Sequence, residues 1–97
     1  MTTQKYILKG KKLVKVDVLT WAQWFETADR KIGFDVIGEK QVSTVFLGID
    51  YNYSSKGKPL LFETVVFPKG ELVERYSTWG EAEAGHKKAI EELKKKL

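Results

Sequence analysis

The fold is decided by the stretch Arg75-Tyr76-Ser77-Thr78-Trp79-Gly80-Glu81-Ala82-Glu83-Ala84-Gly85-His86, in which a predicted strand leads into the last predicted helix. Thr78 and Glu81 have the spacing of a capping box, in which the hydroxyl accepts from a free backbone amide and the Glu side chain bonds back to the cap residue. The final helix is therefore expected to begin at about Trp79. The only histidine of the chain, His86, falls on the apolar stripe of this helix.

Upstream of this stretch the sequence predicts a second helix and several strands. Asp17 is expected to cap a helix that reaches about Ala28, because apolar residues recur there at helical spacing. A small hairpin is predicted before it, around residues 6–8 and 13–16, and four strands follow it, within residues 31–37, 42–49, 60–67 and 72–77. The prediction is one α+β domain over residues 1–97, with an antiparallel sheet of four to six strands and two helices packed on one face.

Strand register predicts which sheet face the helices leave open. A two-residue turn at Gly38-Glu39 places Val36 opposite Gln41 and Phe34 opposite Ser43. One face then holds Ile32, Phe34, Val36, Val45, Leu47 and Ile49, and the helices are expected to cover it. The other face is expected to expose apolar residues from the set Val42, Phe46, Leu61, Val65 and Phe67. Such a patch is typical of an interface, with a homodimer or a protein partner as the alternatives.

Composition limits the class of protein. The 97 residues are 42% hydrophobic and 31% charged, and they include no cysteine. These values predict a soluble domain without disulfides, held together by packing alone. Residues 1–5 lack the apolar core of a signal peptide, and no apolar run is long enough to cross a bilayer. The expected location is cytoplasmic, without membrane association, a metal or a cofactor.

The basic residues gather near the two ends of the chain. Residues 1–15 hold five lysines and no acid, and residues 87–97 hold five lysines against Glu91 and Glu92. Basic clusters of this kind bind nucleic acid in some proteins. An accessory nucleic-acid-binding protein is therefore an alternative, with these lysines as its candidates: Lys9, Lys11, Lys12, Lys94 and Lys95.

The candidates for acid–base chemistry are few. His86 is the obvious one, and Glu63 or Asp50 is a carboxylate that would orient it in a small hydrolase centred on His86. The preferred interpretation is structural. A tight second hairpin places Glu63 opposite Tyr76, and a buried carboxylate needs a donor. A polar network is expected, made of Glu63, Arg75, Tyr76 and His86.

A polar loop follows the second of the four strands and carries two tyrosines that burial does not explain. Tyrosine on loops is common in recognition surfaces. The spacing of Asp50 and Asn52 only faintly matches a calcium loop, because the other acids and the glycine are missing. The partner-binding candidates are therefore Asp50, Tyr51, Asn52 and Tyr53, together with Phe46 on the sheet.

Four segments, residues 21–26, 42–50, 59–64 and 76–86, resemble a family of small uncharacterised proteins encoded by bacteriophages, prophages and related mobile elements. The resemblance implies no activity, cofactor or catalytic residue. The family often has His at position 51 and Glu at position 80, where this chain has Tyr51 and Gly80. A His beside Asp50 would favour a metal or acid–base role, and Tyr51 weakens it. The leading hypothesis is a non-catalytic phage-type protein-binding module, an inhibitor or adaptor that acts on a host or phage protein in the host cytoplasm, as a dimer.

Overall fold

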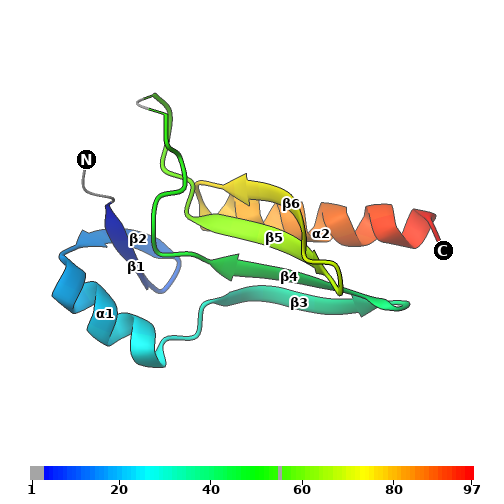
Figure 1. The fold of residues 1–97 in the computed structure, drawn as a ribbon, viewed down its shortest axis with the longest axis horizontal. Coiled ribbons are helices and arrows are strands. Elements are labelled where there is room, and N and C mark those ends of the chain that lie inside the picture. Colours follow the sequence, from blue (N-terminus) through cyan, green and yellow to red (C-terminus); the bar gives the residue numbers. More distant parts are fainter. Residues whose placement is uncertain (1–3, 55) are drawn as a thin grey trace.

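The computed structural model, which describes residues 4–54 and 56–97, contains six strands and two helices (Figure 1). In chain order the elements are β1 (Lys5–Lys9), β2 (Lys12–Val16), α1 (Val18–Thr27), β3 (Lys31–Ile37), β4 (Lys40–Phe46), β5 (Phe62–Phe67), β6 (Glu71–Tyr76) and α2 (Trp79–Lys95). The strands form two antiparallel sheets, β1-β2 and β3-β4-β5-β6. The predicted α+β class with an antiparallel sheet is confirmed.

Both helices begin at the residues that the sequence indicates. Asp17 caps α1, with its Oδ1 accepting from the Thr20 amide at 2.8 Å. Thr78 caps α2, where its hydroxyl accepts from the Glu81 amide and the Glu81 carboxylate accepts from the Thr78 amide, both at 3.1 Å. The capping box therefore fixes the first turn of α2 by satisfying amides that have no partner inside the helix.

The two helices pack at different places along the main sheet. α2 lies along one face and contacts all four strands. α1 packs against β1 at one end of that sheet (Figure 1) and reaches the same side through Trp24, whose ring meets Phe46 edge-on at a centroid distance of 5.7 Å. No helix in the described part of the chain has the length and apolar composition of a membrane span.

The register of the main sheet is set by its hairpin turns and by two bulges, one in β3 between Lys31 and Gly33 and one in β6 after Leu72. Val36 pairs with Gln41 and Phe34 with Ser43, as predicted from the Gly38 turn, where φ is +62°. The predicted pairing of Glu63 with Tyr76 is wrong. The second hairpin has Val66 opposite Glu71, and a bulge after Leu72 then shifts the pairing so that Glu63 lies opposite Arg75.

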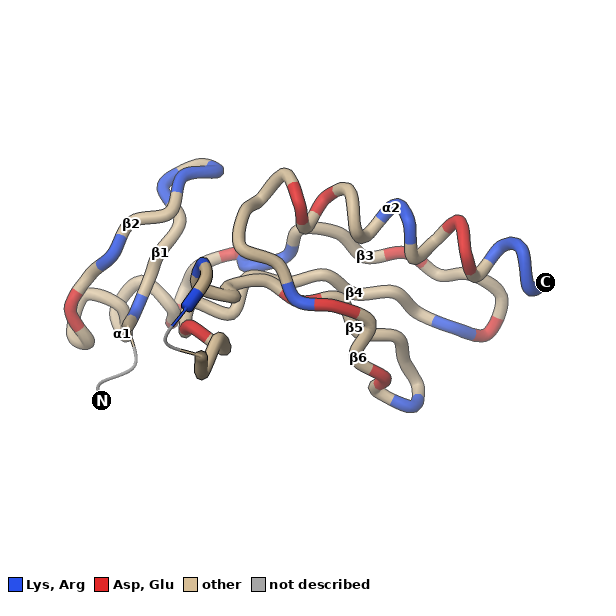
Figure 2. The backbone as a smooth tube through the Cα atoms, turned by 90° about the horizontal axis from the view of Figure 1, so that it is seen from above, with Lys and Arg blue, Asp and Glu red and all other residues tan. Residues whose placement is uncertain are grey.

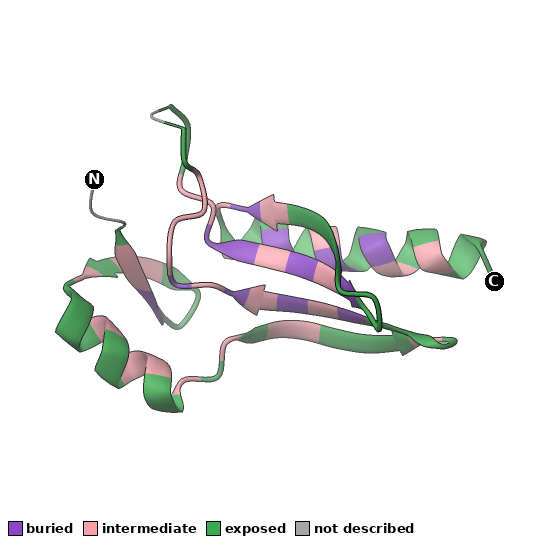
Figure 3. Cartoon of the chain, viewed as in Figure 1, coloured by how far each residue is buried: buried purple, intermediate pink, exposed green. Residues whose placement is uncertain are grey.

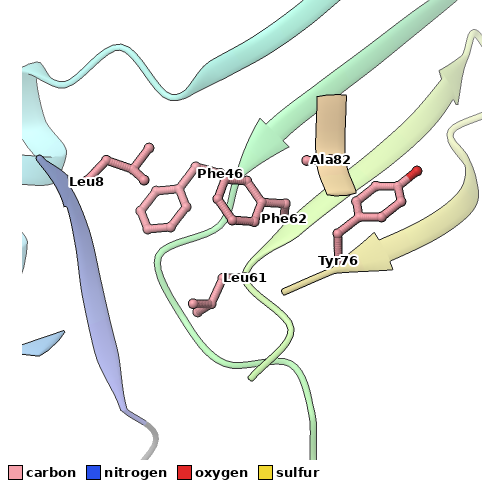
Figure 4. Close-up of a cluster of buried hydrophobic side chains, with 6 residues drawn as sticks. All are labelled: Leu8, Phe46, Leu61, Phe62, Tyr76 and Ala82. Atoms are coloured by element: carbon pink, nitrogen blue, oxygen red, sulfur yellow. The ribbon is translucent and has the colours of Figure 1, made fainter. Parts of the chain in front are cut away.

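The assignment of the two sheet faces was wrong in part: Phe34, Val36 and Val45 face away from α2, where Val65 and Phe67 also lie as expected, but Val42 and Phe46 do not. Val42 and Phe46 are fully buried and lie on the face that α2 covers, as the alternating buried positions of β4 and β5 show (Figure 3). Leu61 is also fully buried, in a cluster at the end of the sheet (Figure 4) whose members are Leu8, Phe46, Leu61, Phe62, Tyr76 and Ala82. Both faces of these strands are apolar, so alternation alone did not decide which face meets a helix.

Gly85 lets the ring of Tyr76 lie directly against α2. A Cβ at position 85 would collide with the phenol of Tyr76, whereas a Cβ at Gly80, in the same helix, would meet no atom within 4 Å. Gly85 is therefore required for close packing of α2 on β6, and Gly80 is not.

We expect Gly85→Ala to lower the free energy of unfolding by about 1–3 kcal/mol, because the added methyl forces the ring or the helix to move. Gly80→Ala is the matched control and should be neutral or stabilising by up to about 1 kcal/mol, because Ala favours helix more than Gly does. Urea denaturation followed by circular dichroism measures both. Equal effects of the two substitutions would contradict this account of Gly85.

Candidate functional site

Two short side chains brace the loop that carries the predicted contact residues. We call residues 50–59 the arm; Ser55 lies outside the described residues. Asp50 Oδ1 accepts from the Asn52 amide at 2.7 Å and from the Leu60 amide at 2.9 Å, which closes the base of the arm. Asn52 Nδ2 donates to the carbonyls of Lys56 and Lys58, and its Oδ1 accepts from the Ser54 amide. The arm projects from the body with its backbone tied by these bonds (Figure 1).

The tyrosines connect the arm to the main sheet. Tyr53 is 82% exposed, and its ring meets that of Tyr51 at a centroid distance of 6.2 Å. The ring of Tyr51 in turn stacks under the guanidinium of Arg75, whose Cζ lies 4.6 Å from the ring centroid. Arg75 Nε donates to Glu63 Oε2 at 3.2 Å. A continuous row of contacts therefore runs from the arm to β5 and β6.

Glu63 and Arg75 lie on the sheet face opposite α2, which we call the open face. The face is best described by its cross-strand rows, since paired residues share a face. Row A is Lys31, Val45, Glu63 and Arg75; row B is Phe34, Ser43, Val65 and Leu72; row C is Val36, Gln41 and Phe67. Within the described residues, neither α1 nor α2 covers these rows.

Under α2, His86 belongs to a different hydrogen-bonded group. Its Nε2 lies 2.7 Å from Asp35 Oδ2, and its Nδ1 lies 2.7 Å from the Thr44 hydroxyl. Thr44 is 2.6 Å from the hydroxyl of Thr64, which accepts from the hydroxyl of Tyr76 at 3.0 Å. We call these five residues the His86 network. Gly33 makes room for it, because a Cβ there would come within 2.8 Å of the imidazole.

One pattern of donors satisfies every member when the imidazole is neutral. Tyr76 donates to Thr64, Thr64 to Thr44, and Thr44 to Nδ1, which leaves Nε2–H to donate to Asp35. Buried polar groups are costly unless they are paired in this way. The arrangement therefore holds α2 on the sheet without an unpaired buried polar atom among the five side chains.

The predicted polar network is thus divided between the two faces of the sheet. Tyr76 and His86 are joined through Thr44 and Thr64, whereas Glu63 and Arg75 pair with each other on the open face. The sequence interpretation missed Asp35, Thr44 and Thr64. A signal was present, because a threonine recurs at an alternating position in two apolar strands, and Gly33 lies opposite one of them.

The order Asp35, His86, Thr44 is that of a carboxylate–histidine–hydroxyl triad. Thr44 is 0% exposed, so no substrate reaches its hydroxyl in this structure. Glu63 and Asp50, the carboxylates considered for a hydrolase, bond to Arg75 and to backbone amides instead of to His86.

Within residues 4–54 and 56–97 no group of three or more His, Cys, Asp or Glu residues gathers as metal ligands.

One predicted partner-binding residue is not at the surface. Phe46 is fully buried, so its selection as a contact residue was wrong.

The lysines proposed to bind nucleic acid lie in two separate places. Lys9, Lys11 and Lys12 surround the β1-β2 turn, and Lys94 and Lys95 end α2 (Figure 2). Lys11 Nζ lies 5.7 Å from the ring centroid of Trp79 at the start of α2, a helix about 25 Å long. They form no single basic patch.

Comparison of the chain with models of protein families, with curated proteins and with solved structures gives no match. The functional argument therefore rests on the geometry of the arm, the open face and the His86 network.

We expect Thr44→Val to lower the free energy of unfolding by about 1–3 kcal/mol, because the substitution keeps the shape but leaves buried His86 Nδ1 without a donor and the O–H of Thr64 without an acceptor. Ser43→Ala removes the neighbouring hydroxyl on the open face and serves as the control, with an expected change within about 0.5 kcal/mol. Denaturant titration measures both. A Thr44→Val protein as stable as the control would show that the His86 network does not hold the fold.

Burial raises the pKa of the Tyr76 phenol above its ordinary value, which is about 10. Above that pH the unfolded chain releases the proton before the folded chain does, so the free energy of unfolding should fall as the pH rises through the folded pKa. Denaturation between about pH 9 and pH 12 measures this loss. The slope should be smaller in Tyr76→Phe, which lacks the phenolic proton; parallel curves for the two proteins would contradict the expectation.

Proposed function

We propose that the chain is a small, non-catalytic protein-binding module of bacteriophage type that recognises a host or phage protein through the arm and acts as an inhibitor or adaptor in the host cytoplasm. The observation that carries the proposal is the exposed Tyr53 beside Tyr51 on a braced arm. Large aromatic side chains are normally buried, and tyrosine is enriched among the residues that dominate binding energy.

The bracing of the arm favours recognition. A loop that becomes ordered only on binding loses conformational entropy at that moment, which weakens affinity. Asp50 and Asn52 already hold the arm backbone in the chain alone through five hydrogen bonds. The tyrosines are therefore presented at a small entropic cost to the complex.

Arg75 extends the recognition surface from the arm to the sheet. Its guanidinium is stacked on Tyr51 and bonded to Glu63 through Nε, so its direction is set before a partner arrives. Tyrosine and arginine are the residue types most enriched in binding hot spots, along with tryptophan. Stacked Tyr51 and Arg75 thus support the same proposal as exposed Tyr53.

The two other functions considered have less geometric support. Binding of nucleic acid would use lysines that lie toward opposite ends of a molecule 44 Å long. Hydrolysis at His86 would need a hydroxyl that a substrate can reach, whereas Thr44, whose hydroxyl bonds to Nδ1, is fully buried.

We expect the tagged full chain to retain a protein from a lysate of its host, with or without nuclease treatment, and Tyr53→Ala to weaken that retention by roughly thirtyfold, the effect of a hot spot of about 2 kcal/mol. Leu19→Ala is the control, because Leu19 is a 66% exposed apolar residue on α1, away from the arm.

Quantitative affinity capture of the three proteins makes the measurement. Retention that nuclease abolishes would favour the nucleic-acid alternative. Equal retention by the Tyr53→Ala and Leu19→Ala proteins would overturn the role of the arm.

A further inference from the structure

The two ends of the His86 network lie on opposite edges of the main sheet. Asp35 belongs to the edge strand β3, and its side chain is 51% exposed. Tyr76 belongs to the other edge strand, β6, about 14 Å away across three strand spacings. The links between them are buried, because Thr44 and Thr64 are fully buried and His86 is 6% exposed. The network is therefore a buried row of hydrogen bonds that crosses the sheet.

The Tyr76 end of the network borders a cleft of about 170 Å³ between β6 and α2, with Gly85 and Lys88 among the residues of its lining. A Cβ at Gly85 would collide with the phenol oxygen, so the hydroxyl lies against the part of α2 that lines the cleft. Glu74 lines the cleft as well. Burial, and to a smaller extent the charge of Glu74, raises the pKa of the Tyr76 phenol. The hydroxyl thus has open volume and a carboxylate near it, in addition to Thr64.

We infer that the His86 network is a pH-dependent relay, in which a proton gained by His86 reverses the three hydrogen bonds that lead to Tyr76 and turns the Tyr76 O–H toward the cleft. The relay joins a site of proton uptake at one edge of the sheet to a hydrogen-bond donor at the other edge. It is separate from the recognition proposed for the arm, because its five members lie on the strands and on α2.

The neutral imidazole sets one direction for the bonds. Its Nε2–H donates to Asp35, so Nδ1 accepts from the hydroxyl of Thr44. A hydroxyl has a single proton to donate, so Thr44 must in turn accept from Thr64, and Thr64 accepts from Tyr76. All three bonds between Tyr76 and the ring therefore point toward His86, and the phenolic proton is directed into the interior.

Protonation of the ring removes the acceptor on which that direction depends. Both nitrogens of an imidazolium are donors, so Nδ1–H donates to Thr44 while Nε2–H still donates to Asp35. Thr44 then donates to Thr64, and Thr64 to the oxygen of Tyr76, whose own proton turns to water in the cleft or to Glu74. One proton enters, every hydroxyl keeps its proton, and each only rotates about its C–O bond. The separations of 2.6–3.0 Å suit either direction.

The charged groups around the relay are few in the described strands. On β3 to β6, the other ionisable side chains that share the sheet face of Thr44 and Thr64 are Asp35, Lys40, Glu71 and Glu74. On α2 itself, Glu83 lies one turn before His86 and Lys87 follows it, and both are exposed. Of these groups, Asp35 bonds directly to the ring, so an imidazolium has a carboxylate as its partner.

NMR spectroscopy of the full chain follows both ends of the relay. His86 is the only histidine, and Tyr76→Phe identifies the Cζ signal of Tyr76 among those of the four tyrosines. Near pH 8 we expect the neutral ring to carry its proton on Nε2. As the pH falls from about 8 to about 4, the Cζ signal of Tyr76, which reports whether the hydroxyl donates or accepts, should change with the same midpoint as the ring signals of His86.

Thr64 distinguishes a relay from a direct effect of the imidazolium charge. Thr64→Val keeps the shape of the side chain without its hydroxyl, so the Tyr76 response should be lost while His86 still titrates. Thr64→Ser keeps the hydroxyl and is the matched control, in which the response should remain. A Tyr76 response that persists in Thr64→Val would show a charge acting through space and would overturn the relay.

Asp35→Ala provides a second test if circular dichroism shows that Thr64→Val is unfolded, since the Asp35 side chain is half exposed. Loss of the carboxylate should move the His86 midpoint to lower pH, because an opposite charge favours the imidazolium. The Tyr76 midpoint should move by the same amount, and midpoints that separate would contradict the relay.

Three results in the wild-type chain would also overturn the proposal: a Tyr76 signal that stays constant while His86 titrates, a neutral ring with its proton on Nδ1, and a ring that stays neutral until the chain unfolds. None of them affects the proposed role of the arm, which is tested at Tyr53.

Discussion

His86 couples α2 to all four strands of the main sheet through side-chain hydrogen bonds. The bonds run from Asp35 on β3 to His86, and from there to Thr44 on β4, Thr64 on β5 and Tyr76 on β6. Apolar packing has no such direction and tolerates a slip of one residue in strands that are apolar on both faces. The His86 network does not, because any slip would leave several buried polar atoms without partners. It therefore fixes the register of the strands and the position of the helix together.

The composition of the open face is a consequence of this network. Thr44 and Thr64 must lie under α2 to reach His86, so the residues that alternate with them must face away. Those alternating positions hold Ser43, Val45 and Val65, and the pairing of Phe34 with Ser43 adds an exposed aromatic ring. A few polar groups inside the fold thus decide which apolar side chains remain outside it. The surface available to another molecule is set by the interior.

The sequence predicted the elements well because their signals are local. The capping box of Thr78, the cap of Asp17 and the Gly38 turn each depend on residues a few positions apart, and all three are present. The faces and the partners of His86 depend on contacts between distant residues. Both faces of β4 and β5 are apolar, a bulge after Leu72 changes the pairing of Glu63, and Asp35 meets His86 across 51 positions of sequence. Periodicity carries no information on such contacts. The exposure of Tyr53 was inferred correctly from the loop composition alone.

The arm and the open face differ in what maintains their shape. In the described part of the chain, Asp50 and Asn52 bond to backbone groups within residues 50–60, so the arm keeps its form through local contacts. The rows of the open face exist only while four strands stay in register, which depends on the His86 network. A change that loosens α2 should consequently disturb the apolar rows before it disturbs the braced tyrosines. Among the described residues, Tyr51 of the arm contacts Arg75 of row A, so the two surfaces meet at the polar row and not at rows B and C.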